Sequence, residues 1–266
     1  MLQLESGWPA RVWPALSRGP TPTNAPTLAL TLALALALAL AGACGPAQGA
    51  SAPAGELPPV QDTIAQRMQA CTVCHGKEGR ATNEGYYPRI AGKPAAYLYN
   101  QLQHFKTGQR HFPAMRHLLQ HMSDDYLHEI ASYFAELDLP YPPAQPSTLA
   151  ASQQAAARQL VFEGAPSRQI PACVSCHGRE MAGMLPATPG LLTLPADYLI
   201  GQLGAWRTGQ RKAAEPDCMA TVAQRLTEDD IAVVSRWLSA QTLPLGTHPA
   251  PAPTSPMPMR CGSHAP

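Results

Sequence analysis

The sequence predicts an all-α protein built from two similar domains in tandem, and three observations support this fold class. A passage that starts at Tyr97 and ends in Thr-Gly-Gln-Arg at 107–110 recurs 101 residues later, from Tyr198 to 208–211. In both copies, apolar and aromatic residues return at spacings of three and four, as on one face of an α-helix. No stretch alternates apolar and polar residues in the way that a half-buried β-strand does.

Each copy is expected to form three helices. The first leads into a cysteine motif and lies near residues 60–70 and 151–163. The second covers about 94–107 and 195–208; it begins at a proline, a favoured first-turn residue, and a glycine follows its end. The third begins at Ser123 or Thr227, whose hydroxyl groups are suited to N-capping, with acidic residues in the next turn.

Composition excludes one class of function. The 266 residues carry 19 Lys and Arg against 18 Asp and Glu, so the formal net charge is +1. A nucleic-acid binder needs a basic excess to displace counterions from phosphate, and this chain has none. Aromatic residues make up only 6% of the chain, too few to fill two ordinary cores, so we expect each domain to be organised around a further group.

The N-terminal segment has the parts of a secretory signal. Arg11 and Arg18 precede an apolar Leu-Ala run at 28–40, and small residues follow it. The run is shorter than the roughly 20 apolar residues of a membrane span, which favours export to the periplasm over the alternative of an uncleaved N-terminal anchor. Cys44 resembles the lipid-modified cysteine of bacterial lipoproteins, although Ala41 stands where leucine is preferred. Lipidation at Cys44, and with it membrane association, therefore stays open.

The duplication and the proline content divide the chain into six parts. A stiff Pro-rich segment separates the two copies, and a second one follows the last copy. The predicted parts are a signal peptide (1–43), a Pro/Ala/Gly-rich leader (44–58), a first domain (59–140), a linker (141–150), a second domain (151–241) and a C-terminal tail (242–266).

A Cys-x-x-Cys-His motif in each copy predicts the chemistry. This motif is the attachment signature of c-type haem: the two thiols form thioethers with one porphyrin, and the histidine is placed beneath the iron. The matching residues are Cys71, Cys74 and His75 in the first copy, and Cys173, Cys176 and His177 in the second. A zinc site is the alternative, but neither copy has the second cysteine pair that it would need. The sequence therefore predicts two covalently bound haem c groups.

The second copy indicates the type of the sixth iron ligand. Between His177 and His248 there is no other histidine, and Met181 and Met184 follow His177 too closely to reach the opposite haem face. Met219 remains, eight residues before Thr227, and Met115 stands eight residues before Ser123 in the first copy. Local competitors in the first copy are His111, His117, His121 and Met122. His/Met ligation raises the iron potential relative to two histidines and leaves no open position for other ligands, which favours electron transfer.

The chain beyond the signal peptide resembles the dihaem cytochrome c4 family, which has two class I cytochrome c domains in tandem. The resemblance rests on both haem motifs, on Pro-Arg-Ile-Ala-Gly at 88–92, on the Gln-Leu helix that ends in Thr-Gly-Gln-Arg, and on a methionine before the Ser-Asp-Asp helix. It implies a periplasmic electron carrier that takes electrons from a quinol-oxidising complex or a dehydrogenase and delivers them to a terminal oxidase. It also implies that the carbonyl groups of Pro88 and Pro189 accept hydrogen bonds from the proximal histidine rings, and that the two haems face each other.

Two other classes of function compete with a free carrier. A cytochrome subunit bound permanently to a periplasmic dehydrogenase would have the same haem domains, so the sequence does not separate it from a carrier. A dihaem peroxidase is disfavoured because it needs an open or displaceable iron site, whereas both copies provide a methionine. We therefore expect that the protein is not an enzyme.

Cys218, Cys261 and the Pro-rich tail depart from the family pattern. Exported proteins rarely keep free thiols, which predicts a Cys218–Cys261 disulfide that ties the tail to the loop presenting Met219. The alternative is a small buried Cys218 and an exposed, free Cys261.

Overall fold

The computed structural model describes residues 61–81 and 86–264. The predicted signal peptide, the leader and Cys44 lie outside the described residues. Among the described helices, none has the length and the apolar character needed to cross a membrane.

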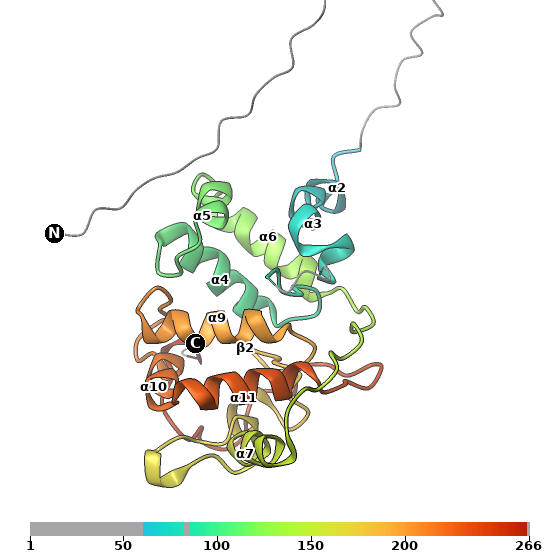
Figure 1. The fold of residues 1–266 in the computed structure, drawn as a ribbon. Coiled ribbons are helices and arrows are strands. Elements are labelled where there is room, and N and C mark those ends of the chain that lie inside the picture. The colour runs from blue at the N-terminus through green and yellow to red at the C-terminus, as the bar shows by residue number, and fades with distance from the viewer. Residues whose placement is uncertain (1–60, 82–85, 265–266) are drawn as a thin grey trace, which may run out of the picture. The chain divides into compact units, whose positions relative to one another are not determined.

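The first half of the described chain contains five α-helices and a 3₁₀ turn, coloured from cyan to green in Figure 1. They are α2 (Ile64–Arg67), α3 (Gln69–His75), η1 (Lys77–Gly79), α4 (Ala95–Thr107), α5 (Pro113–Leu119) and α6 (Asp124–Ala135). Helices α4 and α6 pack on each other and supply most of the first core, in which Leu98, Phe105, Leu127 and Phe134 are buried.

The second half repeats this plan and adds a short hairpin (Figure 1). Its elements are α7 (Ala151–Phe162), η2 (Pro166–Arg168), α8 (Val174–His177), β1 (Gly183–Met184), β2 (Thr188–Pro189), α9 (Ala196–Arg207), α10 (Cys218–Arg225), α11 (Glu228–Ser239) and η3 (Gly262–His264). Helix α11 packs against both α7 and α9, and this second core buries Val161, Leu199, Val234 and Trp237. The all-α class predicted from the sequence is therefore confirmed, with a hairpin of two residues per strand as the only described sheet.

The predicted start of each third helix is also confirmed. The Ser123 hydroxyl accepts a hydrogen bond from the Tyr126 amide at 3.2 Å. The Thr227 hydroxyl accepts one from the Asp230 amide at 3.1 Å, and the Asp230 carboxylate accepts one from the Thr227 amide at 2.8 Å. These bonds satisfy amide groups that have no partner within the helix.

The methionine-bearing segments differ from the prediction, because both are helices rather than loops. Met115 lies on α5 and Met219 lies on α10, so each copy has a helix at a place where the sequence predicted none. The Asp217 carboxylate caps α10 by accepting a hydrogen bond from the Ala220 amide at 2.9 Å. Both helices are shorter than the lengths at which periodicity is readable, which explains why the sequence did not reveal them.

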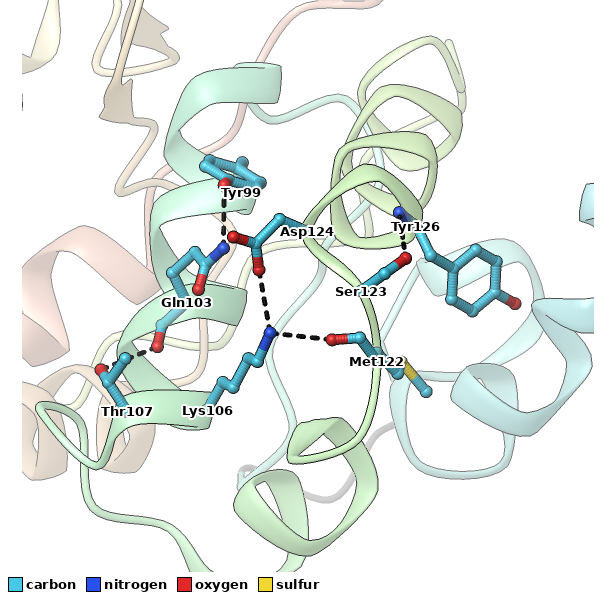
Figure 2. A network of polar contacts seen from close by, with 8 residues as sticks. All are labelled: Tyr99, Gln103, Lys106, Thr107, Met122, Ser123, Asp124 and Tyr126. Carbon is cyan, nitrogen blue, oxygen red and sulfur yellow. Dashed lines mark hydrogen bonds and ion pairs between the residues drawn. The ribbon is translucent and has the colours of Figure 1, made fainter.

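A polar cluster fixes the segment between α5 and α6 (Figure 2). The Lys106 ammonium group, at the end of α4, donates to the Met122 carbonyl and to the Asp124 carboxylate, both at 2.8 Å. The Gln103 side-chain amide donates to the Tyr99 hydroxyl at 2.8 Å on the same helix. The end of α4 thus holds the start of α6, and with it the chain that leaves α5.

The two halves meet through backbone and side-chain hydrogen bonds. Just after α4 and α9, the two Thr-Gly-Gln-Arg segments pair antiparallel, with an isolated bridge between Arg110 and Arg211. The His111 amide donates to the Gln210 carbonyl at 2.7 Å, and the Lys212 amide donates to the Gln109 carbonyl at 2.8 Å. The equivalent residues of the duplicated passage therefore contact each other directly.

Candidate haem-binding sites

The two attachment motifs occupy equivalent positions, at the ends of α3 and α8. The chain leaves each helix immediately after the histidine, through Gly76 with φ 74° and Gly178 with φ 81°. A side chain at Gly178 would approach the Gly183 carbonyl oxygen to 2.7 Å, so glycine is required there by space as well as by backbone angle. This sharp turn returns the following loop across the histidine ring.

Each histidine ring is oriented by a proline carbonyl in that loop. The Nδ1 atom of His75 lies 2.9 Å from the Pro88 oxygen, and Nδ1 of His177 lies 2.8 Å from the Pro189 oxygen. A carbonyl oxygen can only accept, so Nδ1 donates and Nε2 keeps its lone pair free for a metal. The hydrogen bonds that the family resemblance implied are confirmed.

Burial favours the neutral form of both imidazoles. It lowers the pKa of His177 to about 4, against the opposing effect of the Pro189 carbonyl. Burial lowers the pKa of His75 in the same way. A neutral imidazole is the form that binds iron, so burial favours the coordinating form of both rings.

The four motif cysteines are free thiols in the structure. Burial raises the pKa of Cys173 to about 11, and burial also raises the pKa of Cys71 and Cys176. Zinc requires thiolates, and no group of three or more His, Cys, Asp or Glu within residues 61–81 and 86–264 is arranged to hold a metal ion. The zinc alternative therefore lacks a ligand set in the described chain.

In the second half, the predicted ligands line one cavity. Cys173, Cys176, His177 and Met219 all border it, although Met219 is 42 residues from the histidine in sequence. Most of the remaining wall is apolar; it includes Leu194, Leu199, Leu203, Trp206, Val222, Leu226, Val234 and Leu238. Two thiols, an oriented imidazole and a thioether around an apolar space fit a covalently attached porphyrin.

In the first half, Cys71 and Met115 both pack against the first core. The three competing histidines, His111, His117 and His121, are exposed. Met122 is half-buried, and its carbonyl group is engaged by Lys106. In the second half, Met181 is buried in the core, and Met184 lies on β1.

A polar network between the halves was not predicted. Arg110 and Arg211 are both buried, and each guanidinium donates to both Gln101 Oε1 and Gln202 Oε1, at distances between 2.6 and 2.9 Å. Arg110 also donates to the Tyr198 hydroxyl at 2.9 Å, whereas Arg211 reaches the Tyr97 hydroxyl only at 3.5 Å. The sequence showed these residues only as markers of the repeat. The hydrogen bonds that join the halves connect residues 88 to 114 positions apart, and no local pattern indicates them.

Lys93 is a second residue that the sequence did not single out. Its ammonium group donates to the Gly190 carbonyl at 3.1 Å, so a cation of the first half lines the cavity of the second. Burial lowers the pKa of Lys93 to about 8. The repeat offers no signal for this role, since Leu194 occupies the equivalent position.

Cys218 and Cys261 are joined by a disulfide in the structure, with their Cα atoms 5.2 Å apart. Cys218 is the first residue of α10 and directly precedes Met219. The tail is therefore tied to a helix, and not to the loop that the sequence suggested.

No model of a protein family matches the chain, but curated proteins do. The thiosulfate dehydrogenase electron acceptor of Thiomonas intermedia is 34% identical over 174 residues, which cover 65% of this chain and 79% of that protein. Cytochrome c4 of Thiocapsa roseopersicina is 31% identical over 196 residues, covering 71% of this chain and 96% of that protein.

Solved structures agree with these relatives. Reduced recombinant cytochrome c4 from Pseudomonas stutzeri has a TM-score of 0.60 and 28% identity, covering 67% of this chain and 96% of that one. A thiosulfate dehydrogenase from Marichromatium purpuratum has a TM-score of 0.58 and 32% identity over 64% of this chain, and the match spans 36% of its own length.

The duplicated helical fold and its paired Cys-x-x-Cys-His sites define a dihaem c-type cytochrome with class I domains. Its cofactors are two haem c groups, and it is an electron carrier. The chain belongs to the cytochrome c4 family.

Proposed function

We propose that this cytochrome holds one haem in each half and passes single electrons between periplasmic redox proteins. The proposed ligands are Cys71, Cys74, His75 and Met115 in the first half, and Cys173, Cys176, His177 and Met219 in the second. The observation that carries the assignment is the cavity of the second half, where both thiols, His177 and Met219 border one apolar space. When bound, haem supplies reversible one-electron transfer between ferrous and ferric iron.

The surrounding residues favour this reaction over catalysis. Pro88 and Pro189 fix the imidazole rings, so that a change of iron charge does not require the proximal ligands to move. The apolar wall of the second cavity would keep water from a bound haem, and Met115 and Met219 would occupy the iron position that a substrate needs. We therefore assign the chain as a carrier and not as an enzyme, with the domain boundaries given above.

Two donors are candidates. The family resemblance favours a quinol-oxidising complex as donor and a terminal oxidase as acceptor. The relative named as a thiosulfate dehydrogenase electron acceptor favours, as a second candidate, a periplasmic dehydrogenase that oxidises inorganic sulfur compounds. In that case the chain is either a diffusing acceptor or a bound subunit, and co-purification with the dehydrogenase separates the two.

A redox titration of the purified protein, followed by optical and near-infrared absorption, tests the ligand assignment. We expect two covalent low-spin haems per chain, each with a methionine-to-iron charge-transfer band. Met219→His should remove this band from one haem only, while Met122→Leu is the matched control and should leave both bands unchanged. A bis-histidine spectrum for the first haem, or loss of a band in the control, would contradict the assignment.

A further inference from the structure

The C-terminal tail is ordered along the second half, starting next to the hairpin. The Leu185 amide donates to the Ala250 carbonyl and the Ala250 amide donates to the Gly183 carbonyl, both at 2.8 Å. These bonds lay the tail beside β1, with an isolated parallel bridge between Met184 and Ala250. The Tyr141 hydroxyl donates to the Thr247 carbonyl at 3.3 Å, which ties the same stretch to the segment between the halves.

The end of the tail is fixed at three further points. The Cys218–Cys261 disulfide joins it to α10, and the Gly262 amide donates to the Pro216 carbonyl at 3.0 Å. A side chain at Gly262 would collide with the carbonyl groups of the loop before α10, so the tail backbone lies directly on that loop. The last described residue, His264, is hydrogen-bonded to Thr188 on β2.

Between these attachments the tail forms part of the wall of the second haem-binding cavity. The tail residues that border it are Met257, Met259, Cys261, Ser263 and His264. All five are half-buried, whereas residues 251–256 are exposed. The tail therefore turns its sulfur-containing and imidazole side chains toward the cavity and its Pro-rich stretch toward solvent.

The second attachment motif is less exposed to solvent than the first, as expected if the tail covers the second site. His177 is 6% exposed, while His75 is only half-buried. Cys176 is half-buried, while Cys74 is exposed and the adjacent Val73 side chain is 81% exposed. The tail occurs once in the chain, so the duplication supplies no second copy of it for the first half.

From this asymmetry, and resting on the haem ligation proposed above, we propose that the tail covers the second haem and makes the first half the point of exchange with partner proteins. A reduced donor protein passes one electron to the first half and is oxidised by one electron. That electron is then shared with the second half, and an oxidised acceptor withdraws it through the first half. The cover acts by distance, because electron transfer slows steeply as donor and acceptor are separated.

Two variants are designed to remove the cover from the second haem, and a third variant is the control. A chain that ends at Gly246 lacks every tail contact with the hairpin and the cavity, and Cys261→Ser releases only the end of the tail. Arg260→Gln changes an exposed residue of the same tail and is the matched control. Haem count and the methionine-to-iron bands are recorded first, so that failure of the proposed ligation is seen separately from failure of the cover.

The exposure of each haem is then measured by the broadening of its methyl proton resonances by a soluble neutral gadolinium chelate. In the full chain and in Arg260→Gln, we expect the first haem to be broadened more than the second. In the truncated chain and in Cys261→Ser, broadening of the second haem should rise toward that of the first. The initial second-order rate of reduction by hexaammineruthenium(II) should roughly double, because a second entry point opens.

Equal broadening of both haems in the full chain would overturn the proposal. So would truncation and Cys261→Ser variants that keep both haems and both methionine bands but leave the second haem as protected as before. If the truncated chain does not fold, Cys261→Ser decides the question alone, since it keeps the complete tail.

Discussion

The two tyrosines of the network between the halves allow a matched test of its contribution to stability. Tyr198→Phe removes a hydroxyl group that accepts a hydrogen bond from Arg110 at 2.9 Å in a buried position. Tyr97→Phe is the same chemical change at the equivalent residue of the first copy, but its partner Arg211 lies 3.5 Å away and Tyr97 is only half-buried. Both variants keep the ring, so packing is unchanged.

The distances set the expected difference between the two variants. A short hydrogen bond from a buried guanidinium contributes about 1–2 kcal/mol, and Arg110 keeps its two glutamine partners when it is lost. A contact of 3.5 Å is at the limit of hydrogen bonding and contributes less than about 0.5 kcal/mol. Tyr198→Phe should therefore lower the free energy of unfolding by about 1–2 kcal/mol, or about 2–8 °C in Tm for a unit of this size.

Guanidinium chloride unfolding, followed by far-ultraviolet circular dichroism and by Soret absorption, measures the difference. We expect the midpoint to fall for Tyr198→Phe with an unchanged slope, and to stay near that of the parent protein for Tyr97→Phe. Equal losses for the two variants, or a larger loss for Tyr97→Phe, would refute the inference that the Arg110–Tyr198 bond is the stronger of the pair.

Three further outcomes are expected. Met219→Ala should lower the potential of one haem and make that iron bind added imidazole, as seen by optical titration; an unchanged potential would argue against Met219 as ligand. Reduction of the Cys218–Cys261 disulfide, which spans 43 residues, should cost up to about 4 kcal/mol of unfolding free energy by loop-closure entropy, with Cys261→Ser unaffected by reductant. Burial alone would raise the pKa of Asp230, but hydrogen bonds from Arg168 and Thr227 lower it on balance. The ionised Asp230 carboxylate therefore stabilises the fold above the unfolded-state pKa of about 3.9, and this contribution is lost as the pH falls through the folded pKa. In Asp230→Asn, the free energy of unfolding should fall less steeply as the solution is acidified.

The features that the sequence predicted are those with local causes. Ser123 and Thr227 were identified as N-caps because the hydroxyl and the acidic residues that follow it act within one turn. The attachment motifs were identified for a similar reason, since their chemistry needs five consecutive residues. The roles of Pro88 and Pro189 came from the family resemblance, because nothing in their own surroundings indicates which carbonyl a histidine will meet.

The features that escaped prediction depend on contacts between distant segments. Helix α10 has eight residues and is fixed by Asp217 and by the tail, neither of which leaves a periodic pattern. The tail itself is rich in proline and shows no helical or strand period, yet Met257 and His264 border the haem cavity. Lys93 reaches Gly190 across 97 positions, and no local rule connects the two.

The glutamine side chains between the halves have a consequence for how the duplicated copies can diverge. The Oε1 atom of Gln101 accepts hydrogen bonds from both Arg110 and Arg211, and Oε1 of Gln202 does the same. Neither copy therefore satisfies its own buried guanidinium by itself, and a replacement of one amide leaves donors unpaired in both copies. Buried cations without partners are costly, so replacing either glutamine destabilises both repeats. At these four positions a change in one domain therefore also alters the polar contacts of the other.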